Sequence, residues 1–99
     1  MFYNKENLNN AFKELRKLGY FARQNFKCCQ SCAWAAVPMD KAKVVFYHAQ
    51  DNEDLMRYGE CYLAWTGDVD EIAAVLEKHG VLLKKPESEA SRFEITIKR

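Results

Sequence analysis

The sequence is poor in the features that mark unusual classes of chain. It has two prolines and four glycines, which excludes a collagen-like chain, and no glycine-rich phosphate-binding loop is present. No apolar run approaches the roughly 18 residues that a membrane-spanning helix needs. Lys and Arg number 15 against 14 Asp and Glu, a formal net charge of +1. This balance gives no overall attraction for nucleic acid or an anionic membrane.

What the chain does contain is typical of a soluble globular protein. Of its 99 residues, 48% are hydrophobic and 29% are charged, and a chain of this length has room for one hydrophobic core. We therefore expect a single domain over residues 1–99. The first residues lack the basic and then apolar progression of a secretory signal, so we expect a cytoplasmic protein whose thiols stay reduced.

Four stretches have the three-and-four spacing of apolar residues that predicts an α-helix. They cover about residues 5–18, 28–36, 51–58 and 68–79. Asp51 is expected to cap the third helix. Asp68 and Glu71 have the spacing of a capping box at the start of the fourth.

Five further runs, either apolar or strictly alternating, predict β-strands. They cover about residues 20–26, 44–48, 61–65, 81–83 and 93–97. The last two are close enough in the chain to form a hairpin. Strands interleaved with helices favour an α+β fold, with a mixed, mostly antiparallel sheet of four to five strands covered by three to four helices. The order of the strands does not follow from the sequence.

Three of the four cysteines fall within five positions, at Cys28, Cys29 and Cys32. On a helix these three thiols approach one edge, which permits metal binding. Zinc is the metal that such a site would hold, and a tetrahedral zinc site needs a fourth ligand. His48, at the end of the strand predicted over 44–48, is the first candidate, and Cys61 is the alternative.

The same cysteines also fit a redox role or a purely structural one. Residues 29–32 form a Cys-x-x-Cys pair, which can cycle between dithiol and disulfide where a helix N-terminus lowers a thiol pKa. The simplest interpretation is that free cysteines behave as small buried hydrophobic residues. In that case the helix would pack against the sheet through Cys29, Cys32, Ala33 and Ala36.

A second group of polar and aromatic residues flanks the cysteines and predicts an interaction surface. It consists of Arg23, Asn25, Tyr47, His48 and Asp51. Arginine beside aromatic residues is typical of binding surfaces, and strand ends often present polar groups to a cleft. The simpler alternative is that Arg23 and Asn25 lie on the exposed face of an edge strand, that Asp51 caps a helix, and that His48 faces solvent.

One segment carries a resemblance to a known family. Phe21-Ala22-Arg23-Gln24-Asn25-Phe26 leads into Cys28-Cys29-Gln30-Ser31-Cys32, and Phe46-Tyr47-His48 follows. This order resembles a family of uncharacterised bacterial and phage proteins over roughly residues 8–98. The family has no assigned activity, so the resemblance implies motif positions and no chemistry. Its members often have glycine after the third cysteine where this chain has Ala33, so a tightly turned backbone is not expected there.

No complete catalytic constellation is recognisable, so no catalytic or cofactor-binding residue is assigned. We expect a small non-enzymatic interaction or accessory protein of bacterial or phage origin that binds a protein partner, rather than nucleic acid or a membrane. The alternatives are a zinc-stabilised domain and a thiol-redox protein, both based on the cysteine cluster.

Overall fold

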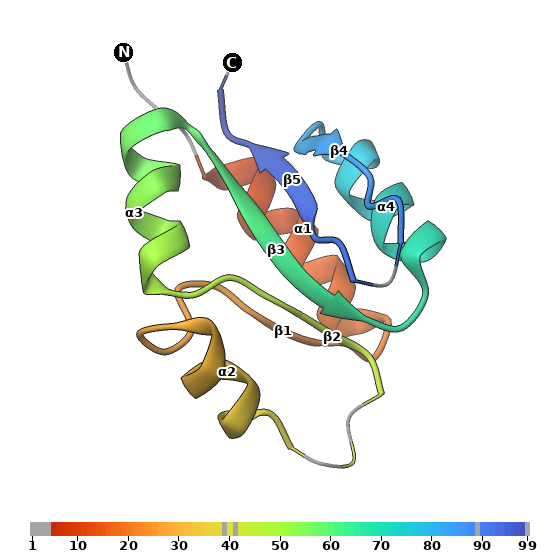
Figure 1. The fold of residues 1–99 in the computed structure, drawn as a ribbon. Helices are drawn as coiled ribbons and strands as arrows, with labels where there is room; N and C mark the ends of the chain where they lie inside the picture. Colours follow the sequence, from red (N-terminus) through yellow and green to blue (C-terminus); the bar gives the residue numbers. More distant parts are fainter. Residues whose placement is uncertain (1–4, 39, 41, 89, 99) are drawn as a thin grey trace.

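Five strands form one mixed sheet in the computed structural model, which describes residues 5–38, 40, 42–88 and 90–98 (Figure 1). The elements follow the order α1 (Glu6–Lys17), β1 (Phe21–Arg23), α2 (Gln30–Ala36), β2 (Val44–Phe46), α3 (Ala49–Tyr58), β3 (Glu60–Thr66), α4 (Val69–Lys78), β4 (Leu82–Lys84) and β5 (Phe93–Thr96). No helix of the described residues is both long and apolar enough to cross a membrane.

The strand order across the sheet is β1-β2-β3-β5-β4. β1 and β2 are parallel, because α2 carries the chain back between them, and the other three pairs are antiparallel. β4 and β5 form the predicted hairpin. The predicted α+β fold with a mixed, mostly antiparallel sheet is therefore confirmed.

One face of the sheet is covered by α1 and α4. The side chains that alternate toward this face, such as Val45, Leu63 and Ile95, are fully buried and join one core cluster. Phe12 of α1 and Leu76 of α4 belong to the same cluster. This cluster contains most of the buried hydrophobic residues, and burial of apolar side chains is the main favourable contribution to folding.

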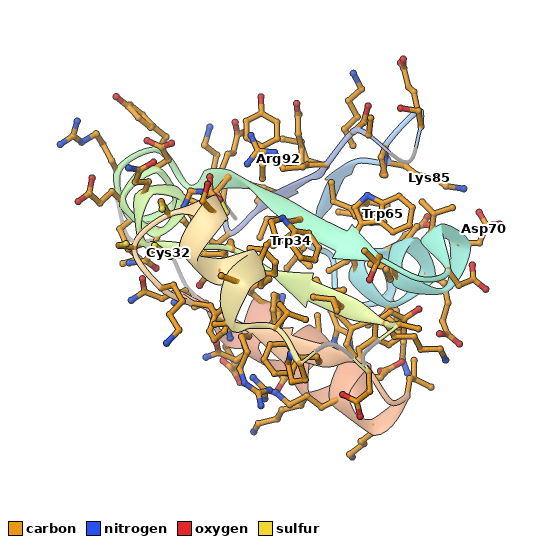
Figure 2. All side chains as sticks on the ribbon, turned by 60° about the horizontal axis from the view of Figure 1, so that its bottom comes forward. Cys32, Trp34, Trp65, Asp70, Lys85 and Arg92 are labelled. Carbon is orange, nitrogen blue, oxygen red and sulfur yellow. The ribbon has the colours of Figure 1, made fainter. Side chains whose placement is uncertain are left out.

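The opposite face is only partly covered. The short helix α2 packs there over β1 and β2 and forms a smaller core cluster. It contains Ala33, Val44, Phe46 and Ala64, with Phe21, Phe26, Trp34 and Val37 packed against it. Trp34 lies between α2 and the strands (Figure 2), with its ring centroid 4.8 Å from that of Phe46.

α3 lies beside the first half of β3, beyond the point where β2 pairs with it (Figure 1). The prediction that Asp51 caps this helix is wrong. The helix begins at Ala49 and His48 is its N-cap, with the His48 Nδ1 accepting a hydrogen bond from the Asp51 N–H at 3.3 Å. Ala49 and Gln50 continue the helix backward because neither residue disfavours helical backbone.

Candidate metal centre

The loop between β1 and α2 determines where the cysteines lie. Asn25 and Lys27 have left-handed backbone conformations, with φ of 51° and 64°, which residues other than glycine rarely adopt. The strand therefore ends at Arg23, short of the predicted end at residue 26. The turned loop is then fixed by its neighbours. Phe26 N–H donates to the Tyr47 carbonyl at 2.8 Å, and Ala49 N–H donates to the Lys27 carbonyl at 2.9 Å.

Aromatic packing orients α2 on the sheet. Phe26 contacts Phe21 and Phe46 edge to face, with centroid separations of 5.5 and 6.0 Å. Ala33 is fully buried beneath the helix. Since Ala33 and Trp34 occupy the side of α2 that faces the sheet, the start of the helix and its cysteines are left at the surface.

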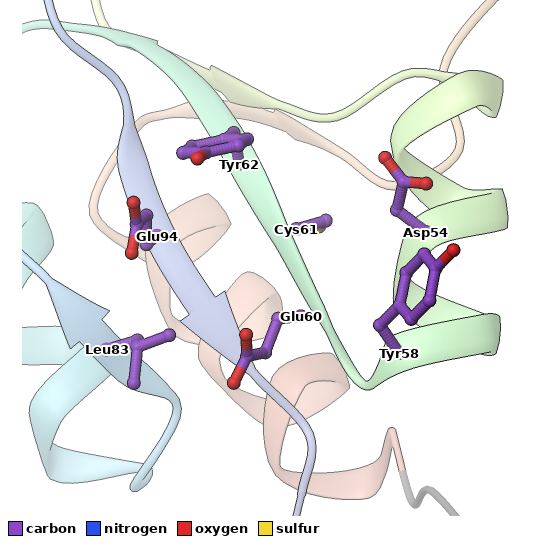
Figure 3. Close-up of a pocket in the computed structure, with 7 residues that line it drawn as sticks. All are labelled: Asp54, Tyr58, Glu60, Cys61, Tyr62, Leu83 and Glu94. Carbon is purple, nitrogen blue, oxygen red and sulfur yellow. The ribbon is translucent and has the colours of Figure 1, made fainter.

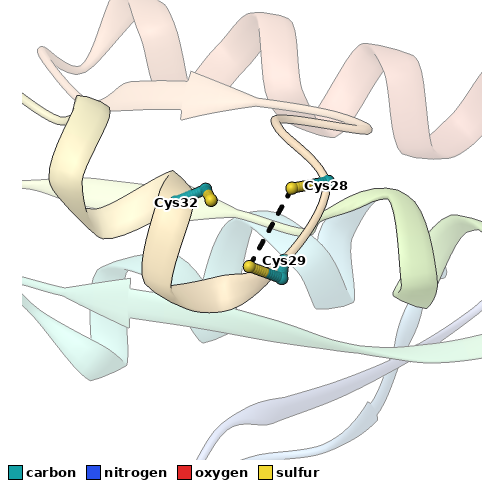
Figure 4. Close-up of side chains that lie close together, drawn as sticks. All are labelled: Cys28, Cys29 and Cys32. Carbon is teal, nitrogen blue, oxygen red and sulfur yellow. Dashed lines mark hydrogen bonds between the residues drawn. The ribbon is translucent and has the colours of Figure 1, made fainter.

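The three clustered cysteines lie together at this surface (Figure 4). Their sulfur atoms are all within 4.8 Å of one another, and the Cys28 and Cys29 sulfurs are 4.0 Å apart. Cys28 and Cys32 are exposed, and Cys29 is half-buried. Of the four residues predicted to pack against the sheet, Ala33 does so. The prediction is wrong for Cys29, Cys32 and Ala36, because the helix starts at Gln30 and presents Ala33 and Trp34 to the sheet.

The thiols differ in how readily they ionise. The backbone N–H of Cys32, followed by its thiol, faces the Cys29 sulfur and lowers the pKa of Cys29 below its ordinary value of 9.0. The neighbouring sulfurs of Cys29 and Cys28 raise the pKa of Cys32 to about 11. Cys29 is thus the thiol in this pair that loses its proton more easily, and thiolates are the form that binds metals and attacks disulfides.

Neither candidate for the fourth ligand belongs to this group of sulfurs. His48 is buried, and both of its ring nitrogens face Asp51: Nδ1 accepts from the backbone N–H, and Nε2 lies 3.3 Å from Oδ2. Cys61 is buried in the main core on β3, where desolvation raises its pKa well above the ordinary value. Coordination by either residue stays a prediction.

The five residues of the predicted interaction surface do not all lie at the surface of the protein. Arg23 and Asn25 are exposed. Tyr47 is fully buried, and its hydroxyl donates to Gln24 Oε1 at 2.8 Å. His48 and Asp51 are each only 7% exposed, which also overturns the alternative of a solvent-facing His48.

Arg92 also contacts this region, and nothing in the sequence around it indicates that contact. Its guanidinium Nη1 lies 3.8 Å from Asp51 Oδ2, although the two residues are far apart in the chain. Desolvation nevertheless raises the pKa of the Asp51 carboxyl above 3.8, with His48 and Arg92 acting in the opposite direction. These three residues form a polar contact between the start of α3 and the residue that precedes β5.

Comparison with known families gives one match. The model of a family described as a domain of unknown function (DUF6891) matches residues 3–98. Neither the curated proteins nor the solved structures include a match to the chain.

Proposed function

The chain belongs to the family described as a domain of unknown function (DUF6891), and from its thiol cluster we propose that it is a small non-enzymatic binding domain that holds a zinc ion. Cys28, Cys29 and Cys32 are the proposed ligands. The observation that carries this proposal is the convergence of three thiol sulfurs to within 4.8 Å of one another at the surface.

The spacing of the sulfurs suits zinc. Thiolates bind zinc at about 2.3 Å in tetrahedral geometry, which separates two sulfur ligands by about 3.8 Å. Cys28 and Cys29 already lie 4.0 Å apart. Because Cys28 and Cys32 are exposed, small side-chain rotations can bring all three sulfurs to this distance. Soft thiolate ligands also favour zinc over magnesium or calcium.

Protonation couples to the proposed binding. Cys29 supplies the first thiolate, since its pKa is lowered. Cys32, with a pKa of about 11, must lose its proton to the solvent when the metal binds. Zinc affinity is therefore expected to rise with pH through the neutral range.

With three protein ligands, the fourth coordination position faces solvent. A water molecule or a side chain of a partner protein would complete the tetrahedron there, in place of the His48 or Cys61 ligand that the sequence suggests. Arg23 and Asn25 are the exposed members of the predicted interaction surface, and a protein partner that contacts them is part of the proposal, as is an accessory role in bacteria or phage.

Elemental analysis of protein purified without chelators tests the zinc site. We expect about one zinc per chain, falling below about 0.2 in Cys28→Ser and Cys32→Ser variants. Cys61→Ala is the matched control. This substitution removes the one thiol outside the cluster, so the variant protein should retain its zinc. Less than about 0.2 zinc per chain in the unmodified protein, even after incubation with zinc and gel filtration, would reject the proposal.

A second candidate function, thiol redox chemistry, is favoured by the unequal pKa values of Cys29 and Cys32. The Cys29 thiolate would attack glutathione disulfide and release one glutathione thiolate. Cys32 would then resolve the mixed disulfide, so that two protein thiols are oxidised and one glutathione disulfide is reduced to two thiols. Mass spectrometry after equilibration in glutathione buffers tests this. A reversible Cys29–Cys32 disulfide in a protein that binds no zinc would favour redox chemistry over the metal site.

A further inference from the structure

One half of the sheet face that carries α2 has no helix over it among the described residues. Tyr62 of β3 and Glu94 of β5 are directly paired across the sheet and point to this side (Figure 3). Leu83 of β4 lies next to them. Tyr58, at the end of α3, borders the same area. These apolar side chains are unusually exposed, with exposed fractions of 56% for Tyr58, 48% for Leu83 and 44% for Tyr62.

A cavity of about 280 Å³ lies between α3 and this open half of the sheet. Its apolar walls are Tyr58, Tyr62 and Leu83 (Figure 3). This volume is just below the range of about 300–1,000 Å³ that is typical of small-molecule sites. It therefore suits a single side chain better than a cofactor.

The charged residues that line the cavity are all acidic: Asp54, Glu60 and Glu94. Glu60 is paired with Lys98, whose Nζ lies 3.2 Å from Glu60 Oε2. Within the described ranges, Asp54 and Glu94 form no ion pair. The cavity thus carries two carboxylates without a cationic partner beside apolar walls, and this combination is complementary to a cation on an apolar stem.

Cationic groups of the chain itself already lie near the rings of both cavity tyrosines. The Arg92 guanidinium lies 4.8 Å from the Tyr62 ring centroid, and the Arg57 guanidinium lies 6.0 Å from that of Tyr58. Arg92 lines the neighbouring cavity, and Arg57 is outside both. Ring faces attract guanidinium and ammonium groups through their quadrupole.

We propose that this cavity binds an arginine or lysine side chain of an extended segment of a partner protein. The alkyl stem packs against Tyr58, Tyr62 and Leu83, and the cationic group is attracted by Asp54 and Glu94. A peptide is favoured over a free amine because the accessible surface continues past the cavity. A second cavity, of about 310 Å³, shares Tyr62 and Glu94 with the first and can take a neighbouring residue of the same segment. Binding at this cavity does not depend on the zinc site.

An NMR titration of the full chain tests the proposal. The probes are capped Gly-Gly-X-Gly-Gly peptides in which X is arginine, lysine, leucine or glutamate. We expect saturable shifts of the Tyr62, Leu83 and Glu94 amides with the arginine and lysine peptides only, weakening as salt is added. Equal shifts with the glutamate or leucine peptide, or no saturable shift with any peptide, would overturn it.

Charge-removing variants give the second readout. Glu94→Gln and Asp54→Asn should each weaken binding of the arginine peptide about three- to fivefold. Glu77→Gln, which changes an exposed carboxylate on α4, is the matched control and should bind as the unmodified protein does. If Glu94→Gln and Asp54→Asn bind the arginine peptide as tightly as Glu77→Gln does, the proposed role of the carboxylates is contradicted. If n-butylamine binds as tightly as the lysine peptide, the source of the cation is a free amine and the peptide proposal is wrong.

Discussion

Lys27 is the residue whose backbone most directly sets the position of the thiols. Its left-handed φ of 64° turns the chain immediately before Cys28, and its carbonyl accepts the Ala49 N–H. A residue with a side chain costs about 1–2 kcal/mol in this conformation. The two loop hydrogen bonds and the packing of Phe26 hold the backbone in this conformation and offset the cost.

Replacing Lys27 by glycine and by valine should therefore change the free energy of unfolding in opposite directions. Lys27→Gly relieves the strain and should raise the free energy of unfolding by about 0.5 kcal/mol, since the relief is partly offset by the greater flexibility of glycine in the unfolded chain. Lys27→Val, with a β-branched side chain, should lower it by at least about 1 kcal/mol. Urea unfolding measures both.

Lys13→Gly is the control for this pair, because Lys13 lies in α1 and is exposed. Glycine within a helix should lower the free energy of unfolding by about 1 kcal/mol. If Lys27→Gly were destabilised as much as Lys13→Gly, the left-handed backbone at Lys27 would carry no strain for glycine to relieve.

Among the single elements, α4 is one whose start can be predicted from neighbouring residues in the sequence. The spacing predicts Asp68 as its cap, and Asp68 Oδ1 accepts the N–H groups of Asp70 and Glu71 at 2.9 and 3.2 Å. These bonds satisfy two of the N–H groups that a helix start leaves without a partner. The cap lies at the surface and depends on no distant residue.

Removing this cap should have a moderate and reversible cost. Asp68→Ala should lower the free energy of unfolding by about 1 kcal/mol, and Asp68→Ser should restore most of that loss, because serine can accept the same hydrogen bonds. Thermal or urea unfolding of the two variants measures the effect. An alanine variant as stable as the unmodified protein would show that the cap contributes nothing.

The elements that the sequence predicts well are those determined by neighbours in the chain. α4, the alternating strand β5 and the β4–β5 hairpin all follow from spacing and turn residues. α2 is predictable only in part. The side of α2 that faces the sheet is set by the contact between Trp34 and Phe46 and by the left-handed loop before the helix. Neither feature can be predicted from the spacing of neighbouring residues.

The candidate site shows the same division. The sequence points to Cys28, Cys29 and Cys32 as a group, because they are close together in the chain. The simplest interpretation buries their thiols, whereas Cys28 and Cys32 are exposed. The Asp51–Arg92 contact is not predictable, because residues far apart in the chain meet there through the sheet. The alternation over 93–97 does indicate that Glu94 faces away from the core.

Over the whole molecule, the two faces of the sheet have different roles. α1 and α4 bury one face in the main core. On the other side of the sheet α2 covers only part of the face (Figure 1), and the thiol cluster and the acidic cavity both lie on that side. Stability and the proposed binding chemistry are thereby assigned to opposite sides.

The packing of α1 on α4 includes an ion cluster that makes stability depend on pH. Glu14 Oε1 lies 3.0 Å from both His79 Nε2 and Lys78 Nζ. His79, followed by Lys78, lowers the pKa of Glu14 below 4.5. The stabilisation is therefore present above the carboxyl pKa of the unfolded chain and is lost as the pH falls through the lower pKa of the folded state.

Glu14→Gln should accordingly be less stable than the unmodified protein at pH 7. The two proteins should approach each other in stability as the pH falls below 4.5, and the difference at pH 7 should shrink in high salt. Urea unfolding at several pH values measures this, with Glu77→Gln as the control. A difference that does not change with pH would mean that the charge of Glu14 is not responsible.

The central claim is that three thiolates hold a zinc ion with the fourth position open to solvent. X-ray absorption spectroscopy at the zinc edge of the zinc-loaded protein tests it most directly. We predict three sulfur ligands at about 2.3 Å and one oxygen or nitrogen ligand at about 2.0–2.2 Å. Four sulfur ligands, or two or fewer, in the unmodified protein would contradict it.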